Sequence, residues 1–324
     1  MISGFSRSNN GTTTTLDSAD GLKEAWERGD SSIWIDVQAP TDSEMSAVDN
    51  VLSLDVEAVE DCLHGEHRPR IDEFDSCIFL IVYGLFVNHE DEQPTPRKLS
   101  VFCGERFLLT VHDGPLRATR ILREKIERHP QRVLRKGVDV LLYTLVDQIV
   151  DIYVDVAEDY EKTLEALEDR SFEISSEETF LEETADLRKK IVELRRIAVA
   201  QRSLFNPIAK GNFEFVSPKL EQSFQHIVGH LTHTIELIDG MREMLGGVVA
   251  NYHSNVAKET NDIVKTLTIY AAILLPLSLI AGIYGMNVPI WPNPNKPVTF
   301  WYVITVMMLI AGGSAVYFRK KKWL

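Results

Sequence analysis

The stretch Thr266–Met286, TLTIYAAILLPLSLIAGIYGM, decides the fold of this chain because it contains 21 consecutive uncharged residues. A second uncharged stretch of the same length covers Val298–Phe318. About 20 apolar residues cross the hydrocarbon core of a membrane as a helix. The connector at residues 287–297 holds four prolines, which lack the backbone donor that a helix needs. The sequence therefore predicts two transmembrane helices joined by a short loop.

The basic residues around these stretches predict their orientation. Lys258 and Lys265 precede the first stretch, residues 319–322 are all basic, and the connector carries only Lys296. Basic residues are retained on the cytoplasmic side of a membrane. Both termini are therefore expected in the cytoplasm and the connector outside, in the cell inner (plasma) membrane, with membrane lipids as partners.

One face of the first helix carries a regular stripe. Its members recur every 3.5 residues on average, which is typical of a helix in a left-handed bundle. They are Asn261, Val264, Leu267, Ala271, Leu275, Ser278 and Gly282. One interpretation is close helix packing, for which small residues are suited. The other is the wall of a pore, which needs several copies of the chain because two helices cannot enclose a water-filled path.

Gly285, Met286 and Asn287 end the first helix with a tripeptide that resembles the signature of the CorA family of divalent-cation channels. Other segments similar to that family lie along most of the chain: Trp34–Val37, Glu60–Leu63, Asn261–Thr268, Pro276 and Lys321–Leu324. The resemblance implies a homopentameric funnel in which five first helices surround a pore. It also implies that Gly285, Met286 and Asn287 form the selectivity filter, with Asn287 as a ring at the mouth.

A ring of asparagines suits a hydrated divalent cation. Mg²⁺ gives up its water reluctantly, and an amide oxygen accepts hydrogen bonds from that water. Leu275, Leu267 and Val264 would be apolar constrictions that close by dewetting. The expected function is influx of Mg²⁺, or of Co²⁺ or Ni²⁺, driven by the membrane potential. Apart from the transported divalent cation, no cofactor is expected.

Two segments depart from the family pattern. The connector, at Val288–Asn295, has no carboxylate where family members carry an acidic residue. The stretch Gln225–His230 and the later position Ala250 lack the acidic residues that family members use to sense magnesium. Inhibition by cytoplasmic magnesium at these positions is therefore not expected. A Zn²⁺ transporter of the ZntB-like type, with or without proton coupling, stays an alternative.

Three histidines, His226, His230 and His233, lie on one helical face at spacings of i, i+4 and i+7. Imidazole suits zinc, nickel and copper, so these residues could bind a softer metal together with Glu236 or a neighbouring chain. The other interpretation is a solvated or helix-packed histidine stripe that holds no metal.

Other groups of residues with metal-ligand side chains are not expected to bind a metal ion. Cys62, His64 and His67 are interpreted as structural because no second cysteine pair supports a zinc site. Two carboxylate clusters, at residues 72–75 and 89–92, are interpreted as solvated loop charges, with regulatory cation sites as the alternative.

The remaining pattern predicts an α/β cytoplasmic domain followed by long helices. A polar segment at 1–21 is expected to be flexible. The α/β subdomain covers 22–137, and its sheet is expected to be at least partly antiparallel. Long helices occupy 138–262, followed by the first membrane helix at 263–287, an external loop at 288–297, the second membrane helix at 298–318 and a basic tail at 319–324.

Local signals place individual elements in this scheme. Strands are predicted at Ile33–Val37, Cys77–Phe86, Leu99–Cys103 and Arg106–His112, the last two joined by Gly104-Glu105. Helices are predicted at Thr41–Leu52 with a capping box to Glu44, and at Asp55–Leu63, Leu116–His129, Val138–Leu167, Thr179–Ala209 and Pro218–Met286. A flex is expected near Gly246-Gly247 because glycine weakens helices.

Charge and composition exclude other classes of protein. All 48 acidic residues and 28 of the 34 basic ones lie in residues 1–262, a net charge of −20, which argues against a nucleic-acid partner. The three scattered cysteines indicate a reducing compartment. No nucleophile motif or phosphate-binding glycine loop is present, so the chain is not expected to be an enzyme. An alternative from another class is a membrane-anchored metal sensor or scaffold that conducts nothing.

Overall fold

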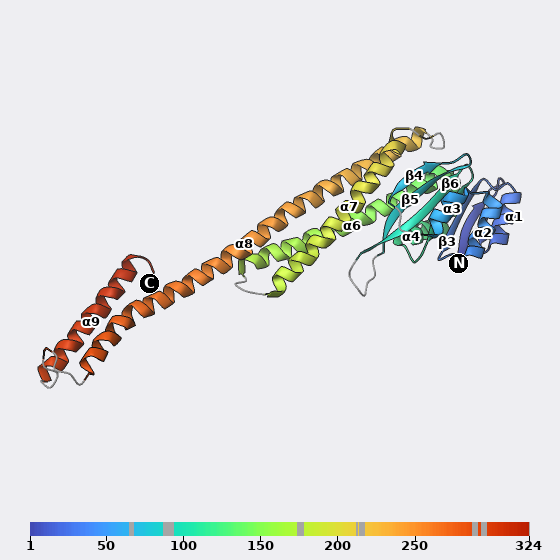
Figure 1. Cartoon of the computed structure of the whole chain (residues 1–324). Helices are drawn as coiled ribbons and strands as arrows, with labels where there is room; N and C mark the ends of the chain where they lie inside the picture. The colour runs from blue at the N-terminus through green and yellow to red at the C-terminus, as the bar shows by residue number, and fades with distance from the viewer. Residues whose placement is uncertain are drawn as a thin grey trace. The chain divides into compact units, whose positions relative to one another are not determined.

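The structure is a computed structural model, which describes residues 1–64, 68–86, 94–173, 178–211, 213, 218–286, 291–292 and 297–323. The chain divides into two compact units. The first contains Met1–Leu167 and Glu182–Gly246, and the second contains Glu168–Leu181 and Gly247–Leu324. Figure 1 shows the sheet and the first long helices of the first unit, and the two apolar helices of the second.

A mixed seven-stranded sheet with the order β2-β1-β3-β7-β6-β5-β4 forms the centre of the first unit. Its strands are β1 (Ile2–Arg7), β2 (Thr13–Leu16), β3 (Ser32–Gln38), β4 (Arg70–Glu73), β5 (Cys77–Phe86), β6 (Thr95–Gly104) and β7 (Phe107–His112). Five of the six neighbouring pairs are antiparallel, and β3 runs parallel to β7. The prediction of an α/β domain with a partly antiparallel sheet is confirmed.

The expectation of a flexible segment at residues 1–21 is wrong. This segment contains β1, β2 and the start of α1 (Ala19–Glu27). β1 pairs along its whole length with the buried strand β3, and Phe5 stacks on Trp34 with the ring centroids 6.2 Å apart. Gly4 permits this pairing because a Cβ atom there would lie 2.1 Å from the carbonyl oxygen of Trp34. A long-range partner therefore orders a segment whose composition is polar.

The hairpin between β6 and β7 turns one residue later than predicted. Gly104 ends β6, so the two connecting residues are Glu105 and Arg106. A Cβ atom at Gly104 would lie 2.3 Å from the ring of Phe107, so the close approach of that ring requires glycine. β6 also starts earlier than predicted, at Thr95, because it pairs with the full length of β5.

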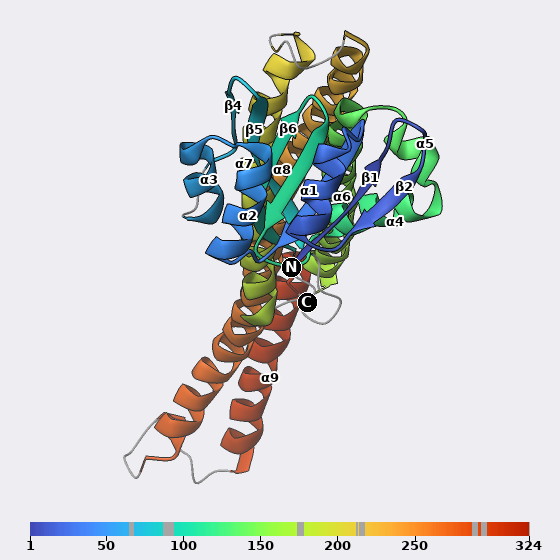
Figure 2. The same cartoon turned by 90° about the vertical axis from the view of Figure 1, so that its right-hand side faces the viewer.

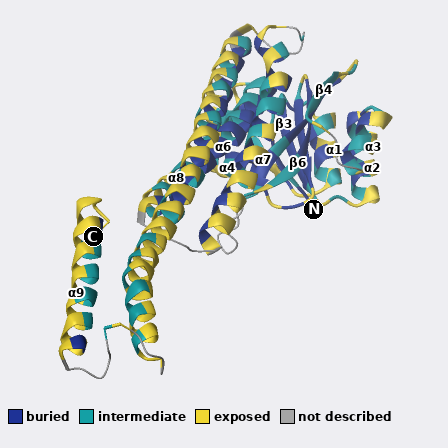
Figure 3. Cartoon of the chain, turned by 60° about the vertical axis from the view of Figure 1, so that its left-hand side comes forward, coloured by how far each residue is buried: buried dark blue, intermediate teal, exposed yellow. Residues whose placement is uncertain are grey.

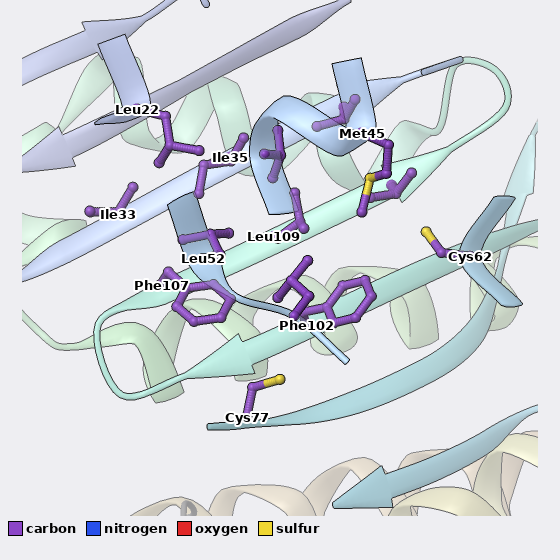
Figure 4. Packing of buried hydrophobic residues seen from close by; sticks show 14 of the residues in the cluster. Leu22, Ile33, Ile35, Met45, Leu52, Cys62, Cys77, Phe102, Phe107 and Leu109 are labelled. Carbon is purple, nitrogen blue, oxygen red and sulfur yellow. The ribbon is translucent and has the colours of Figure 1, made fainter. Parts of the chain in front are cut away.

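Three helices cover one face of the sheet: α1, α2 (Asp42–Leu52) and α3 (Val56–Leu63). The predicted capping box is present, since Thr41 accepts from the Glu44 amide at 3.2 Å and Glu44 accepts from the Thr41 amide at 3.0 Å. The core between these helices and the sheet is shown in Figure 4 and includes Leu22, Ile33, Ile35, Met45, Leu52, Phe102, Phe107 and Leu109. Figure 2 looks onto this helical layer.

The opposite face of the sheet carries α4 (Arg117–Arg128), followed by α5 (Pro130–Leu134). The guanidinium of Arg123 on α4 lies over the ring of Trp34 at 5.6 Å, and Trp34 points away from the core formed by Ile33 and Ile35. Pro130 ends the preceding helix as predicted and begins α5, because its fixed dihedral suits the first helical position.

The long helices are α6 (Val138–Glu173), α7 (Glu178–Ala209), α8 (Pro218–Tyr284) and α9 (Pro297–Lys320). In the first unit, Phe224 of α8 contacts both Tyr143 of α6 and Phe205 of α7. Gln201 of α7 donates to the Tyr83 carbonyl at 2.7 Å, and Tyr153 of α6 donates to the same oxygen. This oxygen joins the long helices to strand β5.

The second unit joins the end of α6 and the start of α7 to the middle of α8. Asn255 donates to the Ser171 carbonyl at 2.7 Å, and Phe180 stacks on Tyr252 with the centroids 4.8 Å apart. α8 continues without interruption from Pro218 to Tyr284 and contains Pro276. The predicted start of this helix is confirmed, and its end differs from the predicted one by two residues.

Candidate ion pathway

Helices α8 and α9 are, among the described residues, the two that are long and apolar enough to cross a membrane. None of the most apolar window of α8 is buried in the chain, and only 6% of that of α9 is. Figure 3 shows that the end of α8 and most of α9 are exposed or intermediate in burial. A core helix of a water-soluble domain would be covered by protein, so this exposure favours a lipid or oligomeric environment.

The predicted stripe lies on the exposed side of α8. All seven residues, Asn261, Val264, Leu267, Ala271, Leu275, Ser278 and Gly282, are exposed, with 67% of Leu267 and 68% of Leu275 accessible. The described structure therefore leaves the whole stripe exposed, as it does neighbouring positions such as Leu274 and Leu279.

A second face of α8 lies on the opposite side of the helix and is partly covered. Its half-buried members are Lys265, Ile269, Ile273, Pro276, Leu277, Ile280 and Tyr284. Helix α9 runs beside this part of α8 in both Figure 1 and Figure 2. Half-buried residues of α9 recur at helical spacing: Val303, Val306, Met307, Ile310, Ala311, Ser314 and Ala315. The half-buried residues of α8 thus lie on the face opposite the stripe, and the stripe itself is left exposed.

Polar side chains along the first part of this segment are satisfied within the helix. The hydroxyl of Thr266 donates to the Asp262 carbonyl at 2.8 Å, and that of Thr268 donates to the Val264 carbonyl at 2.7 Å. Lys265 pairs with Asp262 at 2.9 Å, where the charged part of α8 ends. The helix can therefore enter an apolar environment without leaving these hydroxyl donors unpaired.

The tripeptide predicted to be the filter begins immediately after α8, which ends at Tyr284. The amide of Gly285 donates to the Ala281 carbonyl at 2.9 Å, and that of Met286 donates to the Ile283 carbonyl at 3.2 Å. A Cβ atom at Gly285 would lie 3.1 Å from the Ala281 oxygen, which is a tight contact. The φ of Gly285 is not in the left-handed region, so close approach and not backbone conformation favours glycine here.

The third predicted filter residue, Asn287, lies outside the described residues, together with 288–290 and 293–296 of the connector. The structure places Gly285 and Met286 at the end of the helix that carries the stripe, and Met286 is 58% exposed. Two of the three predicted filter residues are thus located, and the role of all three stays a prediction.

The predicted histidine metal site does not form within one chain. His226, His230 and His233 are exposed on α8 in the first unit. Among the described residues, no three His, Cys, Asp or Glu side chains lie close enough to hold one metal ion. The reason is geometric: residues i and i+7 are separated by about 10.5 Å along a helix, so their rings do not converge.

The structure instead relates one of these histidines to an acidic face of α6. Burial raises the pKa of the Asp151 carboxyl, and the neighbouring Asp147 raises it further, whereas His230 of α8 lowers it. The spacing of the histidines alone did not indicate this electrostatic neighbour, because Asp151 lies about 80 residues away in the sequence.

The other groups of metal-ligand residues have structural surroundings or are not described. Cys62 is a residue of α3 that is buried in the core, and burial raises the pKa of its thiol to about 11. This burial supports the structural interpretation of Cys62. Asp72 pairs with Arg70 at 2.7 Å. His67 and the cluster at residues 89–92 lie outside the described residues.

Comparison with known proteins decides the family. A family model described as CorA-like Mg2+ transporter protein matches residues 29–320. The chain belongs to this family. Its members are transporters, so the expectation that the chain is not an enzyme is confirmed.

Individual CorA relatives are similar over most of their length. The chain is 28% identical over 290 residues to the putative metal ion transporter YfjQ of Bacillus subtilis, covering 90% of this chain and 89% of the relative. It is also 28% identical over 266 residues to the cobalt/magnesium transport protein CorA of Thermotoga maritima, covering 82% and 76%.

A solved structure extends the likeness to the fold. The complete structure of the CorA magnesium transporter from Methanocaldococcus jannaschii matches with a TM-score of 0.87 at 24% identity. The match covers 100% of this chain and 99% of the other. The α/β domain, long helices and two membrane-length helices are therefore those of the CorA fold.

Proposed function

We propose that this chain forms a homopentamer that conducts divalent cations, with Mg²⁺ as the main ion and Co²⁺ or Ni²⁺ as further ones. The observation that carries the proposal is the exposed stripe on the membrane-length part of α8, which leads to Gly285 and Met286. The family match to CorA-like Mg²⁺ transporters supports the ion class.

Symmetry supplies the path for the ion. One chain contributes two described membrane-length helices, which are too few to surround water. Because the half-buried face of α8 lies opposite the stripe, copies related by a rotation axis can bring their stripes to that axis with α9 outside. The pore would then have polar or small positions at Asn261, Ala271, Ser278 and Gly282, and apolar constrictions at Val264, Leu267 and Leu275.

Selectivity in this proposal belongs to Asn287. A ring of neutral amides accepts hydrogen bonds from the waters of a hydrated cation without binding the ion as tightly as carboxylates do. The connector beyond it has no carboxylate in residues 287–297, so the ring and not a charged entrance discriminates between ions.

The driving force is the membrane potential. Both termini are proposed to lie in the cytoplasm and the connector outside the inner membrane, because the basic residues flank the helices on one side. A divalent cation moving inward gains about 4.6 kcal/mol at 100 mV, twice the value for one elementary charge. The net charge of −20 on residues 1–262 favours cations on the receiving side.

The first experiment measures Mg²⁺ uptake into proteoliposomes with a potential imposed by a potassium gradient. Asn287→Ala is expected to lose selectivity or flux, whereas Asn295→Ala, a matched change elsewhere in the connector, is expected to keep both. Unaltered uptake by Asn287→Ala would remove Asn287 from the filter.

A second experiment identifies the ion. Uptake of Mg²⁺, Co²⁺, Ni²⁺ and Zn²⁺ is compared in the same vesicles, with and without a pH gradient. The proposal expects Mg²⁺ uptake that follows the potential. Zinc uptake that follows the pH gradient, without Mg²⁺ uptake, would establish the zinc alternative, and metal binding without any flux would indicate a sensor or scaffold.

A further inference from the structure

A pocket of about 520 Å³ opens in the first unit where the sheet meets α4. Its wall includes Gln38 and His112, the last residues of β3 and β7, and these strands form the one parallel pair of the described sheet. The carboxyl ends of parallel strands are a common location for ligands in α/β proteins. The volume lies within the range of small-molecule sites.

The pocket is lined by a strongly basic helix in an acidic chain. Residues 117–136 contain eight Arg or Lys and two Glu, although the chain has a net charge of −14. Arg117, Arg120 and Arg123 follow one another at spacings of three on α4, and all three line the pocket. This local positive charge is not required by the solubility of the protein, which its acidic surface already supports.

The three arginines differ in whether their guanidinium groups already form ion pairs within the chain. Arg123 pairs with Asp36 at 3.4 Å and lies over Trp34, so it is part of the pocket floor. Arg117 pairs with Asp155 at 3.3 Å, but both side chains are about half exposed, so this pair is weak. Arg120 is exposed; its backbone amide donates to the Leu116 carbonyl at 3.2 Å, but its guanidinium forms no hydrogen bond or ion pair with any described residue.

The carboxylate of Asp36, which lines the pocket, already has hydrogen-bonding and charged partners. The carboxylate of Asp36 accepts a hydrogen bond from the Thr110 hydroxyl at 2.6 Å, lies 3.1 Å from Nε2 of His112 and pairs with Arg123. Its side chain is 9% exposed. An anion in the pocket would therefore meet the uncompensated charge of Arg120, and not that of Asp36.

The start of α4 adds backbone donors to the same wall. Leu116 occupies the cap position and provides no side-chain hydrogen bond to the first turn. The amides of a first helical turn have no partner within the helix, and the helix dipole favours negative charge there. Phe86 and Leu116 supply an apolar surface beside these donors.

We infer that this pocket binds a small phosphorylated metabolite. Its phosphate lies against Arg117, Arg120 and the first turn of α4, and its organic part lies against Phe86 and Leu116. Arginine recognises phosphate through paired charge-assisted hydrogen bonds, which makes phosphate a better match than an uncharged ligand. The inference rests on the pocket alone and holds whether or not the chain conducts Mg²⁺.

Calorimetric titration of the full chain, purified in detergent and kept in EDTA, tests the inference. The probes are inorganic phosphate, AMP and adenosine. Phosphate and AMP are expected to bind saturably, AMP the more tightly, and adenosine is expected not to bind. Arg120→Glu and the milder Arg120→Gln should weaken AMP binding by about tenfold or more, because each removes a charge-assisted hydrogen bond.

Arg128→Glu is the matched control, because Arg128 lies on the same helix, is 74% exposed and does not line the pocket. It is expected to leave AMP binding within about twofold of the unchanged chain, since exposed charges at a distance are screened by salt. Three results would overturn the inference: no saturable binding of phosphate or AMP, equal binding of adenosine and AMP, or equal losses in the Arg120 and Arg128 variants.

Discussion

At the scale of single residues, a paired charge fixes α7 against α8. Arg195 donates to Asp239 through Nε at 2.7 Å and through Nη2 at 3.1 Å, and Arg242 reaches the same carboxylate at 3.2 Å. Hydrogen bonding from Arg195 lowers the pKa of Asp239. Because both partners are more than one third exposed, solvent screens the pair and limits its contribution to stability.

Asp239→Asn is expected to reduce the free energy of unfolding at pH 7 by less than about 1 kcal/mol. A carboxyl whose folded pKa is lowered contributes stability above its unfolded pKa, near 3.9, and loses it as the pH falls through the folded pKa. The difference between the two proteins in the free energy of unfolding should therefore shrink as the pH falls below about 4, and vanish only below the lowered folded pKa. Thermal unfolding of the variant and of the unchanged chain between pH 3 and pH 7 measures this difference in stability.

The control for this change is Asp159→Asn, which removes an exposed pair with Lys162 within α6. It should have almost no effect at either pH, because neighbouring pairs on a helix surface contribute little. A difference for Asp239→Asn that persists unchanged at pH 3 would contradict the assigned cause.

The three cysteines, Cys62, Cys77 and Cys103, are buried as free thiols. Burial raises the pKa of each thiol, and the thiolate is the reactive form. They are expected to resist maleimide at pH 7.5 in the folded protein and to react after denaturation in urea. Mass spectrometry counts the adducts, and rapid labelling of the folded chain would show that the core opens.

At the scale of secondary-structure elements, the membrane-length part of α8 has an exposed stripe on one side and a half-buried face on the other. Cysteine substitution can test this division, because the native cysteines are buried and give little background. Leu275→Cys, on the stripe, is expected to react with a small charged thiol reagent applied to vesicles and to lose flux. Ile273→Cys, on the half-buried face, is expected to do neither.

Labelling of Ile273→Cys together with protection of Leu275→Cys would reverse the assignment of the two faces. Equal protection of both positions in a conducting protein would show that water reaches neither face, and the stripe would then be a packing surface between helices.

Helix α8 contains a pair of adjacent glycines, Gly246 and Gly247, in its middle. The division of the chain into two compact units falls between Gly246 and Gly247, and α8 continues through this point. Apart from the nearby backbone of α8 itself, no described atom lies within 4 Å of a Cβ placed at Gly247, so alanine fits there. Gly247→Ala is expected to stabilise the helix by up to about 1 kcal/mol. If a flex at this position accompanies conduction, the change should also slow Mg²⁺ flux.

Gly229→Ala is the matched control, because Gly229 is also exposed within α8 and a Cβ placed there likewise has no atom within 4 Å. It should stabilise the protein without changing flux. Unfolding and vesicle uptake measure the two effects, and equal flux in both variants would remove the expected flex near Gly246-Gly247.

At the scale of the whole molecule, the exposed stripe needs other copies of the chain. Native mass spectrometry from lipid nanodiscs is expected to give the mass of five chains of 36.7 kDa each. Disruption of the pentamer should accompany loss of flux, because one chain cannot enclose water. A stable monomer that still conducts would contradict the proposed assembly.

Parts of the candidate site could be predicted from sequence and others could not. The stripe from Asn261 to Gly282 was predictable because it depends only on helical period, and its exposure in the structure agrees. The histidines showed the limit of spacing, because a common helical face does not bring residues i and i+7 of one chain to a single ion. The arginines of α4 become a pocket only through their position against β3 and β7, which lie far from one another in sequence.

The sequence by itself determined the elements whose signals are local. Uncharged length predicted the two membrane helices, helical period predicted α6 to α8, and the Thr41–Glu44 spacing predicted a cap that the structure contains. The tertiary structure alone decided the order of the sheet, the parallel pairing of β3 with β7 and the recruitment of residues 2–16 as strands. The physical reason is that a helix satisfies its hydrogen bonds within one segment, whereas a strand depends on a distant partner that local composition does not specify.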